Sequence, residues 1–240
     1  MAPSDRGVVA RVPISDRTQD KAGGTFLSSY ARTLTNGGLR FHTDRTDVVA
    51  LLCVRQAMKG GVSTLASTPA IHNAILARRP DLLDALFTDY WRSRFGEEGT
   101  GKDGSSTTRA TAYPLPIFGV VDGKFTSHYS LTFIEAAQLA DDIPKLSAAQ
   151  KEAIDVLMAT AQELCFEMTL EPGDLQLINS HVTYHGRTPF EDDADSGHDR
   201  LLLRLWLTIA NNRPLPAGHE VLWQSIEAGQ PRGGIQQVTM

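Results

Sequence analysis

The stretch FHTDRTD at residues 41–47 places a histidine and a carboxylate two positions apart, directly ahead of the apolar run VVALLCV. In an extended strand, His42 and Asp44 would lie on one side, because side chains alternate between the two faces. A histidine and a carboxylate on one side can bind the same metal ion. The pair alone is a weak signal, since a chain with 7 histidines and 28 acidic residues contains such spacings by chance.

A second stretch, NSHVTYHGRTPFED at residues 179–192, adds two candidate ligands, His181 and His185. Two histidines and one carboxylate bind Fe(II) on one face of its octahedron and leave the other positions open. An α-keto acid can occupy two of the open positions, and O2 can occupy the third. These residue types therefore predict oxidation at a non-haem iron centre.

The segment RLLLRLWLTI at residues 200–209 alternates strictly between two faces. Its odd-numbered positions are all leucine or isoleucine, which we expect to form the core. The opposite face mixes two arginines with other side chains: Arg200, Leu202, Arg204, Trp206 and Thr208. We expect this face to line a barrel, where guanidinium groups need anionic partners such as the distal carboxylate of a keto acid. An ion pair with an internal Asp or Glu is the alternative.

Strands are the main elements that must position these residues. Residues 41–57 are predicted to form one strand, with a turn at 59–61 and a return strand beyond it. The sequence PIFGVVDGKFTSHY predicts a β-hairpin that turns at Asp122-Gly123. Residues 175–179 and 200–209 complete the expected strands.

Two helical regions are expected between these strands. The first begins near Thr68 and is divided into two short helices by Pro80. The second runs from Ser147 to about Met168, and its helical apolar period indicates that it covers one face of a sheet. This order predicts a mainly β barrel or sandwich with inserted helices.

Length and composition are those of one globular domain over residues 1–240, with 41% hydrophobic and 21% charged residues. We expect residues 1–40 to form a short N-terminal arm and residues 96–112 a mobile loop. The net charge of −5 does not indicate a basic surface that would bind nucleic acid or an anionic membrane. Two cysteines in apolar segments and no visible secretory signal predict a cytoplasmic location.

Three blocks of the sequence resemble the TauD/TfdA superfamily of Fe(II)/2-oxoglutarate-dependent dioxygenases, which includes taurine dioxygenase and clavaminate synthase-like enzymes. The blocks are FHTDRTDVVALLCVRQAMKGGVST, LEPGDLQLINSHVTYHGRTPFED, and RLLLRLWL followed by NNRPLP. They occur in this order over roughly residues 41–217. The resemblance implies a double-stranded β-helix (jelly roll). It also implies oxidation of a C–H bond of a small substrate, with Fe(II), 2-oxoglutarate and O2 consumed to give succinate and CO2.

The resemblance also implies roles for individual residues. The metal ligands would be His42, Asp44 and His185, with His181 excluded. Arg200 would hold the distal carboxylate of 2-oxoglutarate, with a hydroxyl group from Ser63 or, one residue out of register, Thr64. Arg204 matches a position that contacts an anionic substrate group in some members, so we expect a small acidic substrate.

Two departures from the family pattern bear on these roles. Asp199 stands where relatives often carry a basic residue, and it is expected to pair with Arg200 and weaken its anion binding. Only 41 residues precede His42, whereas family members generally have a longer N-terminal region that contributes substrate contacts.

Two other functions fit part of the pattern. A zinc-loaded hydrolase would use the same three ligands but leaves the two arginines without a role. A non-catalytic jelly-roll module would use the arginines to capture a small carboxylic acid. The choice between hydroxylation, desaturation and cyclisation is open at this point, as is the oligomeric state, a homo-oligomer included.

Overall fold

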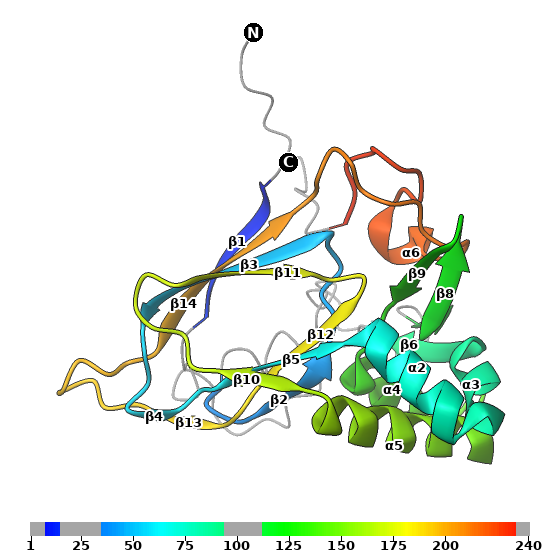
Figure 1. The fold of residues 1–240 in the computed structure, drawn as a ribbon, viewed down its shortest axis with the longest axis horizontal. Coiled ribbons are helices and arrows are strands. Elements are labelled where there is room, and N and C mark those ends of the chain that lie inside the picture. Colours follow the sequence, from blue (N-terminus) through cyan, green and yellow to red (C-terminus); the bar gives the residue numbers. More distant parts are fainter. Residues whose placement is uncertain (1–7, 15–34, 94–111, 234–240) are drawn as a thin grey trace, which may run out of the picture.

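A computed structural model describes residues 8–14, 35–93 and 112–233 of the chain. Two four-stranded sheets face each other across the molecule (Figure 1). One of them has the longer strands and is called the larger sheet, and the other is called the smaller sheet. This is the mainly β jelly-roll architecture that the sequence predicts. The predicted loop at residues 96–112 lies outside the described residues, apart from Ala112.

All strand pairs in the two large sheets are antiparallel. In the spatial order of its strands, the larger sheet consists of β1 (Val8–Ile14), β14 (Leu201–Leu207), β3 (Val48–Arg55) and β11 (Leu175–Asn179). In the same way, the smaller sheet consists of β10 (Phe166–Met168), β5 (Ser63–Ser67), β12 (Thr183–Arg187) and β2 (Leu39–His42). Three two-stranded pairs flank them: β4 (Lys59–Gly60) with β13 (Phe190–Glu191), β6 (Asp89–Ser93) with β7 (Ala112–Pro116), and β8 (Phe118–Val121) with β9 (Lys124–Ser127).

Helices lie at one end of the two sheets (Figure 1) and pack there against the outer face of the smaller sheet. They are α2 (Thr68–Arg78), α3 (Pro80–Leu86), α4 (Leu131–Gln138) and α5 (Ala148–Glu163), and a short α6 (Glu220–Trp223) lies near the β8-β9 hairpin. Ala66 and Tyr184 from the smaller sheet join Ile154, Leu157 and Ala161 of α5 in one buried cluster. The prediction that the second helical region covers a sheet is therefore confirmed.

The interruption at Pro80 and the hairpin are confirmed as well. Pro80 begins α3 directly after α2, since its ring fits the first helical turn but not a helix interior. The hairpin turns at Asp122 and Gly123, which both have positive φ, as a tight hairpin turn requires.

Two predicted elements have the wrong extent. The single strand expected over residues 41–57 is two strands, β2 and β3, separated by a loop at residues 43–47. The helix expected to reach Met168 ends at Glu163, and residues 166–168 form β10, which pairs with β5. The helical period over Leu164, Cys165 and Met168 is misleading, because the helix is capped at Leu164 and pairing with β5 determines the conformation from Phe166 onward.

The assignment of the two faces of β14 is also wrong in one respect. The arginine face is the more deeply buried one, with Arg200, Leu202 and Arg204 each 6% exposed or less. Its leucine face is only half-buried and lies on the outside of the larger sheet. On the same face, Leu177 of β11, which lies beyond β3, is 62% exposed. Both arginines therefore point into the space between the sheets, as predicted.

Candidate active site

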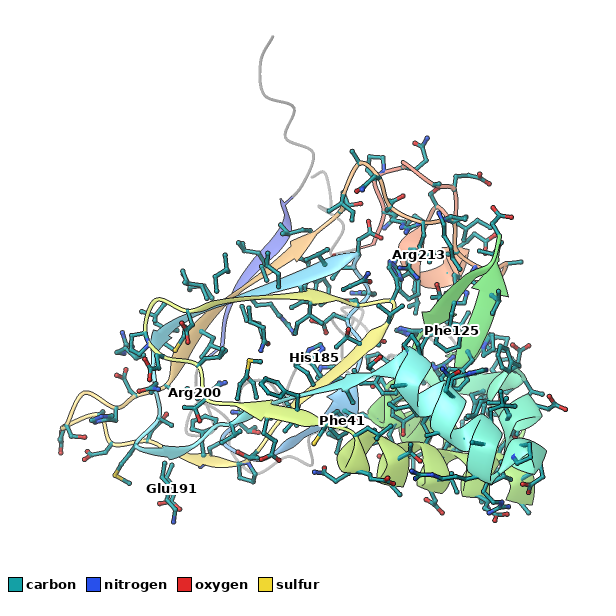
Figure 2. All side chains as sticks on the ribbon, in the orientation of Figure 1. Phe41, Phe125, His185, Glu191, Arg200 and Arg213 are labelled. Carbon is teal, nitrogen blue, oxygen red and sulfur yellow. The ribbon has the colours of Figure 1, made fainter. Side chains whose placement is uncertain are left out.

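The three predicted metal ligands lie together between the two sheets. One ligand atom from each of His42, Asp44 and His185 lies within 4.8 Å of the others, and all three residues are buried. Nε2 of His42 is 3.8 Å from Oδ1 of Asp44, and Nε2 of His185 is 4.0 Å from Oδ2. Figure 2 shows His185 in the interior, between the two sheets.

Strand pairing brings the two histidines together. His42 is the last residue of β2 and lies opposite His185 of β12, so that their ring centroids are 4.2 Å apart. Gly186 permits β12 to lie close to β2 and β5, because a Cβ atom at this position would be 2.8 Å from the Leu39 carbonyl oxygen and 2.8 Å from the Thr64 hydroxyl. Asp44 follows β2 in the loop, so it does not share a strand with His42 as the sequence suggested.

The protonation states of the cluster suit a divalent cation. Burial lowers the pKa of His42, and burial together with His42 lowers the pKa of His185 to about 3, so both imidazoles are neutral near pH 7. Burial raises the pKa of the Asp44 carboxyl, but Arg204 and the two histidines outweigh it and lower the value to about 2. Metal ligation requires neutral imidazoles and an ionised carboxylate, and these pKa shifts favour that state at neutral pH.

Neighbouring groups orient the ligand atoms. The Nδ1–H of His42 donates to the carbonyl oxygen of Arg40 at 2.9 Å, which leaves the Nε2 lone pair on the side of Asp44. Oδ2 of Asp44 accepts a hydrogen bond of 2.7 Å from the indole of Trp206 and one of 3.2 Å from the guanidinium of Arg204. The donor set, its burial and its protonation therefore fit Fe(II) bound by two histidines and one carboxylate.

The contact between Arg204 and Asp44 was not foreseen from the sequence. The sequence allows an ion pair between these arginines and an internal carboxylate, but it points to Asp44 only as a metal ligand. The alternation of β14 could have indicated the contact, because it places Trp206 and Arg204 on the face that meets the metal ligands.

Arg200 has a different environment from Arg204. Its side chain is 6% exposed, and Nη1 is buried without a hydrogen-bond partner among the described residues. Asp199, expected to pair with it, instead binds Arg55 through two hydrogen bonds of 2.6 and 2.7 Å. Adjacent residues of an extended chain point to opposite sides, so Asp199 faces away from Arg200. The expected weakening of Arg200 by Asp199 is therefore wrong.

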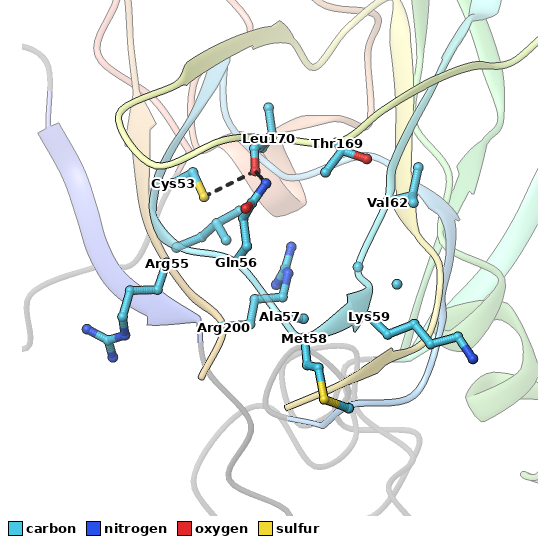
Figure 3. A pocket seen from close by; sticks show the side chains of 13 residues that line it. Cys53, Arg55, Gln56, Ala57, Met58, Lys59, Val62, Thr169, Leu170 and Arg200 are labelled. Carbon is cyan, nitrogen blue, oxygen red and sulfur yellow. Dashed lines mark hydrogen bonds between the residues drawn. The ribbon is translucent and has the colours of Figure 1, made fainter. Parts of the chain in front are cut away.

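A pocket of about 270 Å³ lies against Arg200 at the end of the barrel away from the helices (Figures 2 and 3). Figure 3 shows the Arg200 side chain among the residues that line it, with Cys53, Gln56 and Leu170 opposite. Gly61 has φ +69°, and a Cβ atom there would be 2.9 Å from Nε of Arg200. The glycine therefore leaves room for the guanidinium, whose pKa burial lowers. Among the described residues, Asp192 is the carboxylate near this guanidinium, and it accepts a hydrogen bond from the Arg200 backbone and not from its side chain. A buried cation with an unpaired nitrogen beside a pocket is suited to an anionic ligand.

Ser63 and Thr64 lie on opposite faces of β5. Ser63 is opposite Arg187 and shares the face of His185 and Leu65, and Leu65 packs in the cluster between the sheets. Thr64 shares the face of Ala66 and Tyr184, which packs against the helices. The structure thus places Ser63, and not Thr64, on the side of the candidate site.

His181, the other candidate ligand, lies outside the cluster. Its Nε2 atom forms a hydrogen bond of 2.8 Å with Asp47, and the residue is 3% exposed. Burial lowers its pKa despite this carboxylate. The choice of His185 over His181 agrees with this geometry.

The chain is similar to a known protein family and to individual known proteins. The model of the family described as taurine catabolism dioxygenase TauD, TfdA family matches residues 5–206. FR-33289 synthase from Streptomyces rubellomurinus is 35% identical over 189 residues, which cover 76% of this chain and 53% of that protein. Clavaminate synthase 2 from Streptomyces clavuligerus is 27% identical over 213 residues, covering 82% and 57%. The chain spans about half the length of the relatives it matches.

Solved structures show the same fold. An asparagine oxygenase in complex with Fe(II), 3-hydroxyasparagine and succinate superimposes with a TM-score of 0.59 at 19% identity, covering 82% of this chain and 56% of that one. The non-haem iron oxygenase OrfP in complex with Fe and α-ketoglutaric acid gives 0.55 at 19% identity, with the same coverage. The family match and the fold agree, and this chain belongs to the TauD/TfdA family of dioxygenases.

Proposed function

We propose that this chain is an oxygenase that uses Fe(II), 2-oxoglutarate and O2 to oxidise a C–H bond of a small molecule. The observation that carries the proposal is the buried cluster of His42, Asp44 and His185, in a chain of the TauD/TfdA family. Bound Fe(II), with 2-oxoglutarate and O2, supplies the oxidising chemistry and yields succinate and CO2. The side chains hold the metal, orient the cosubstrate and exclude water.

Arg200 is proposed to bind the distal carboxylate of 2-oxoglutarate. Its unpartnered Nη1, its burial and the adjacent pocket support this role. A carboxylate there would form a charge-assisted hydrogen bond in a poorly solvated place, where such bonds are strong. Ser63, on the inner face of β5, is proposed to add a hydroxyl hydrogen bond to the same carboxylate.

The substrate is proposed to be a small molecule with an acidic group near Arg204. Asp44 already forms an ion pair with Arg204, so Arg204 does not by itself require an acidic substrate. A divalent cation on Asp44 would change this balance, because the carboxylate would then share its charge between the cation and the guanidinium. The asparagine oxygenase and OrfP complexes hold hydroxylated amino acids, which supports a substrate of this size and class.

The two other functions are less well supported. A zinc hydrolase accounts for the three ligands but gives no use to the buried Arg200, whose Nη1 has no hydrogen-bond partner among the described residues. A binding module accounts for Arg200 but not for the neutral histidines that surround an ionised Asp44. Neither corresponds to the dioxygenase family to which the chain belongs.

Three further expectations stay predictions. These are the cytoplasmic location, the lack of nucleic-acid and membrane partners, and the single-domain organisation with its N-terminal arm and its loop at 96–112. Within the described ranges, no helix has both the length and the apolar character needed to cross a membrane.

Succinate release provides the test of this function. The purified chain would be incubated with 2-oxoglutarate and O2 after loading with Fe(II) or with Zn(II), in the presence of a panel of small acids and their amides. We expect succinate with Fe(II) only, and stimulation by an acid but not by its amide. Turnover that requires Zn(II) and yields no succinate would contradict the proposal. Equal stimulation by an acid and its amide would show that the substrate does not need an acidic group.

A further inference from the structure

A second buried carboxylate, Asp47, lies three residues after Asp44 at the end of the same loop. It is 1% exposed, and both of its oxygens accept several hydrogen bonds. Oδ1 accepts from Nε2 of His181 at 2.8 Å and from two nitrogens of Arg232 at 2.8 and 3.0 Å. Oδ2 accepts from the Thr208 hydroxyl at 2.8 Å, the Asn212 amide at 3.0 Å and the Ile209 backbone at 3.3 Å.

These donors belong to the segments that carry the candidate site. His181 lies in the turn that leads into β12, four residues before His185. Thr208 directly follows β14, which carries Arg204 and Trp206. The Asp47 carboxylate therefore joins the loop of Asp44 to the strand of the distal histidine and to the strand whose side chains bind Asp44.

The segment after α6 completes this arrangement. Arg232 is 3% exposed and reaches Asp47 from 185 residues further along the chain. At Gly233, a Cβ atom would lie 2.4 Å from the carbonyl oxygen of Arg45, so this segment packs directly on the backbone next to Asp44. Two independent contacts thus hold the 43–47 loop against the end of the described chain.

The loop needs such support, because Asp44 lies outside the strand ladders. His42 and His185 are placed by the pairing of β2 with β12, which does not include Asp44. Within the loop, backbone and hydroxyl contacts of Thr43 and Thr46 provide further anchors, to Tyr129 and Leu207. Neither anchor joins the loop to the turn before His185. Asp47 does so twice, because its carboxylate binds His181 and its backbone carbonyl accepts from the Ser180 N–H at 3.1 Å. Only the contact with His181 depends on the Asp47 side chain.

We infer that Asp47 is a positioning residue for the metal centre, an inference that rests on the proposed function. Its carboxylate sets the position of Asp44 relative to the two histidines and to the donors on β14. Asn in its place would have nearly the same shape. However, its amide nitrogen would face either the guanidinium of Arg232 or the amide nitrogen of Asn212 and the backbone N–H of Ile209, and these groups donate but cannot accept. The loop would then relax, and the three metal ligands would be less well aligned.

Co(II) titration of the metal-free protein tests this role without relying on turnover. The visible absorption of bound Co(II) reports both affinity and ligand geometry. The variants are Asp47→Asn, Thr208→Val and Arg232→Lys, and Asp81→Asn, which removes a carboxylate from a surface ion pair with Arg79, is the matched control. We expect about tenfold weaker Co(II) binding and a changed spectrum in Asp47→Asn, as for other residues that orient metal ligands. Smaller changes in the same direction are expected in Thr208→Val and Arg232→Lys.

Each outcome decides one of the claims. Folded variants that bind Co(II) with the affinity and spectrum of the unchanged protein would overturn the inference, because Asp47 would then serve stability alone. If Asp47→Asn does not fold, the same criterion applies to Thr208→Val and Arg232→Lys. Failure of the unchanged protein to bind Co(II) would contradict the proposed function itself, a result distinct from loss of binding in the variants only.

Discussion

The indole nitrogen of Trp206 donates a hydrogen bond of 2.7 Å to Oδ2 of Asp44. Among the described residues, no group donates a hydrogen bond to the other oxygen, Oδ1, which lies 3.8 Å from Nε2 of His42. The carboxylate is therefore held at one oxygen and left available at the other. This arrangement suits a ligand that binds a metal through one oxygen.

Trp206→Phe should weaken metal binding. The phenyl ring keeps most of the packing but cannot donate to Asp44, and a hydrogen bond to a charged acceptor contributes about 1.5–3 kcal/mol. We expect the Kd for Fe(II) or Co(II) to rise roughly tenfold or more, measured by competition with a chelating dye under anaerobic conditions. Trp91→Phe, on β6 and outside the candidate site, is the control and should leave the Kd unchanged. Equal Kd values for the two variants would show that the Trp206 hydrogen bond does not support the metal.

Arg200→Ala should raise the Kd for 2-oxoglutarate. Loss of a charge-assisted partner worth about 1.5–3 kcal/mol corresponds to a change of roughly 10- to 150-fold. Arg55→Ala is a matched control, because Arg55 borders the same pocket but pairs with Asp199. Calorimetric titration of 2-oxoglutarate into the metal-loaded protein would measure both. An unchanged Kd for 2-oxoglutarate in Arg200→Ala would show that Arg200 does not bind the distal carboxylate. Arg204 would then be the candidate for this role.

Ser63→Ala and Thr64→Val form a second matched pair. Ser63 lies on the inner face of β5, and Thr64 lies on the face toward the helices. We expect Ser63→Ala to raise the Kd for 2-oxoglutarate severalfold, by loss of a hydrogen bond of about 1 kcal/mol. Thr64→Val should affect only the free energy of unfolding. The reverse result would mean that the resemblance places this hydroxyl one residue out of register.

The sequence was sufficient to predict the architecture and to select His42, Asp44 and His185, which the structure brings together in one cluster. Strict alternation in residues 200–209 and the blocks around His42 and His185 identified the strands that meet at the site. The leucine face was misassigned because alternation separates two faces but does not say which one meets the opposite sheet. The position of Asp44 in a loop could not be predicted either, since the break between β2 and β3 follows no glycine or proline.

Hydrogen-bond partners that are distant in sequence were the least predictable features. Asp47 is 134 residues from His181 and 185 from Arg232, and no local pattern links them. Asp199 was expected to pair with its neighbour Arg200, whereas the extended chain directs it toward Arg55 on the adjacent strand. Such contacts depend on the register of strands in the folded sheet, which the sequence alone does not specify.

The Asp47 network should make stability dependent on pH. Burial raises the pKa of the Asp47 carboxyl, but hydrogen bonds from His181 and Arg232 outweigh it and hold the pKa well below its ordinary value. A carboxyl with a lowered folded-state pKa stabilises the fold fully above its unfolded pKa of about 3.9, and this stabilisation is lost as the pH falls further. Urea unfolding of metal-free protein should therefore show a larger difference between the unchanged chain and Asp47→Asn at pH 7 than at pH values below 4. A difference that grows on acidification would contradict this assignment.

The central claim is that Fe(II) binds at His42, Asp44 and His185 and accepts 2-oxoglutarate there. Anaerobic addition of Fe(II) and 2-oxoglutarate, followed by visible absorption spectroscopy, tests it most directly. We predict a metal-to-ligand charge-transfer band in the unchanged protein that requires both additions. The band should be absent from His185→Ala and retained in His72→Ala, a control on α2. No band in the unchanged protein, or a band of full intensity in His185→Ala, would contradict the claim.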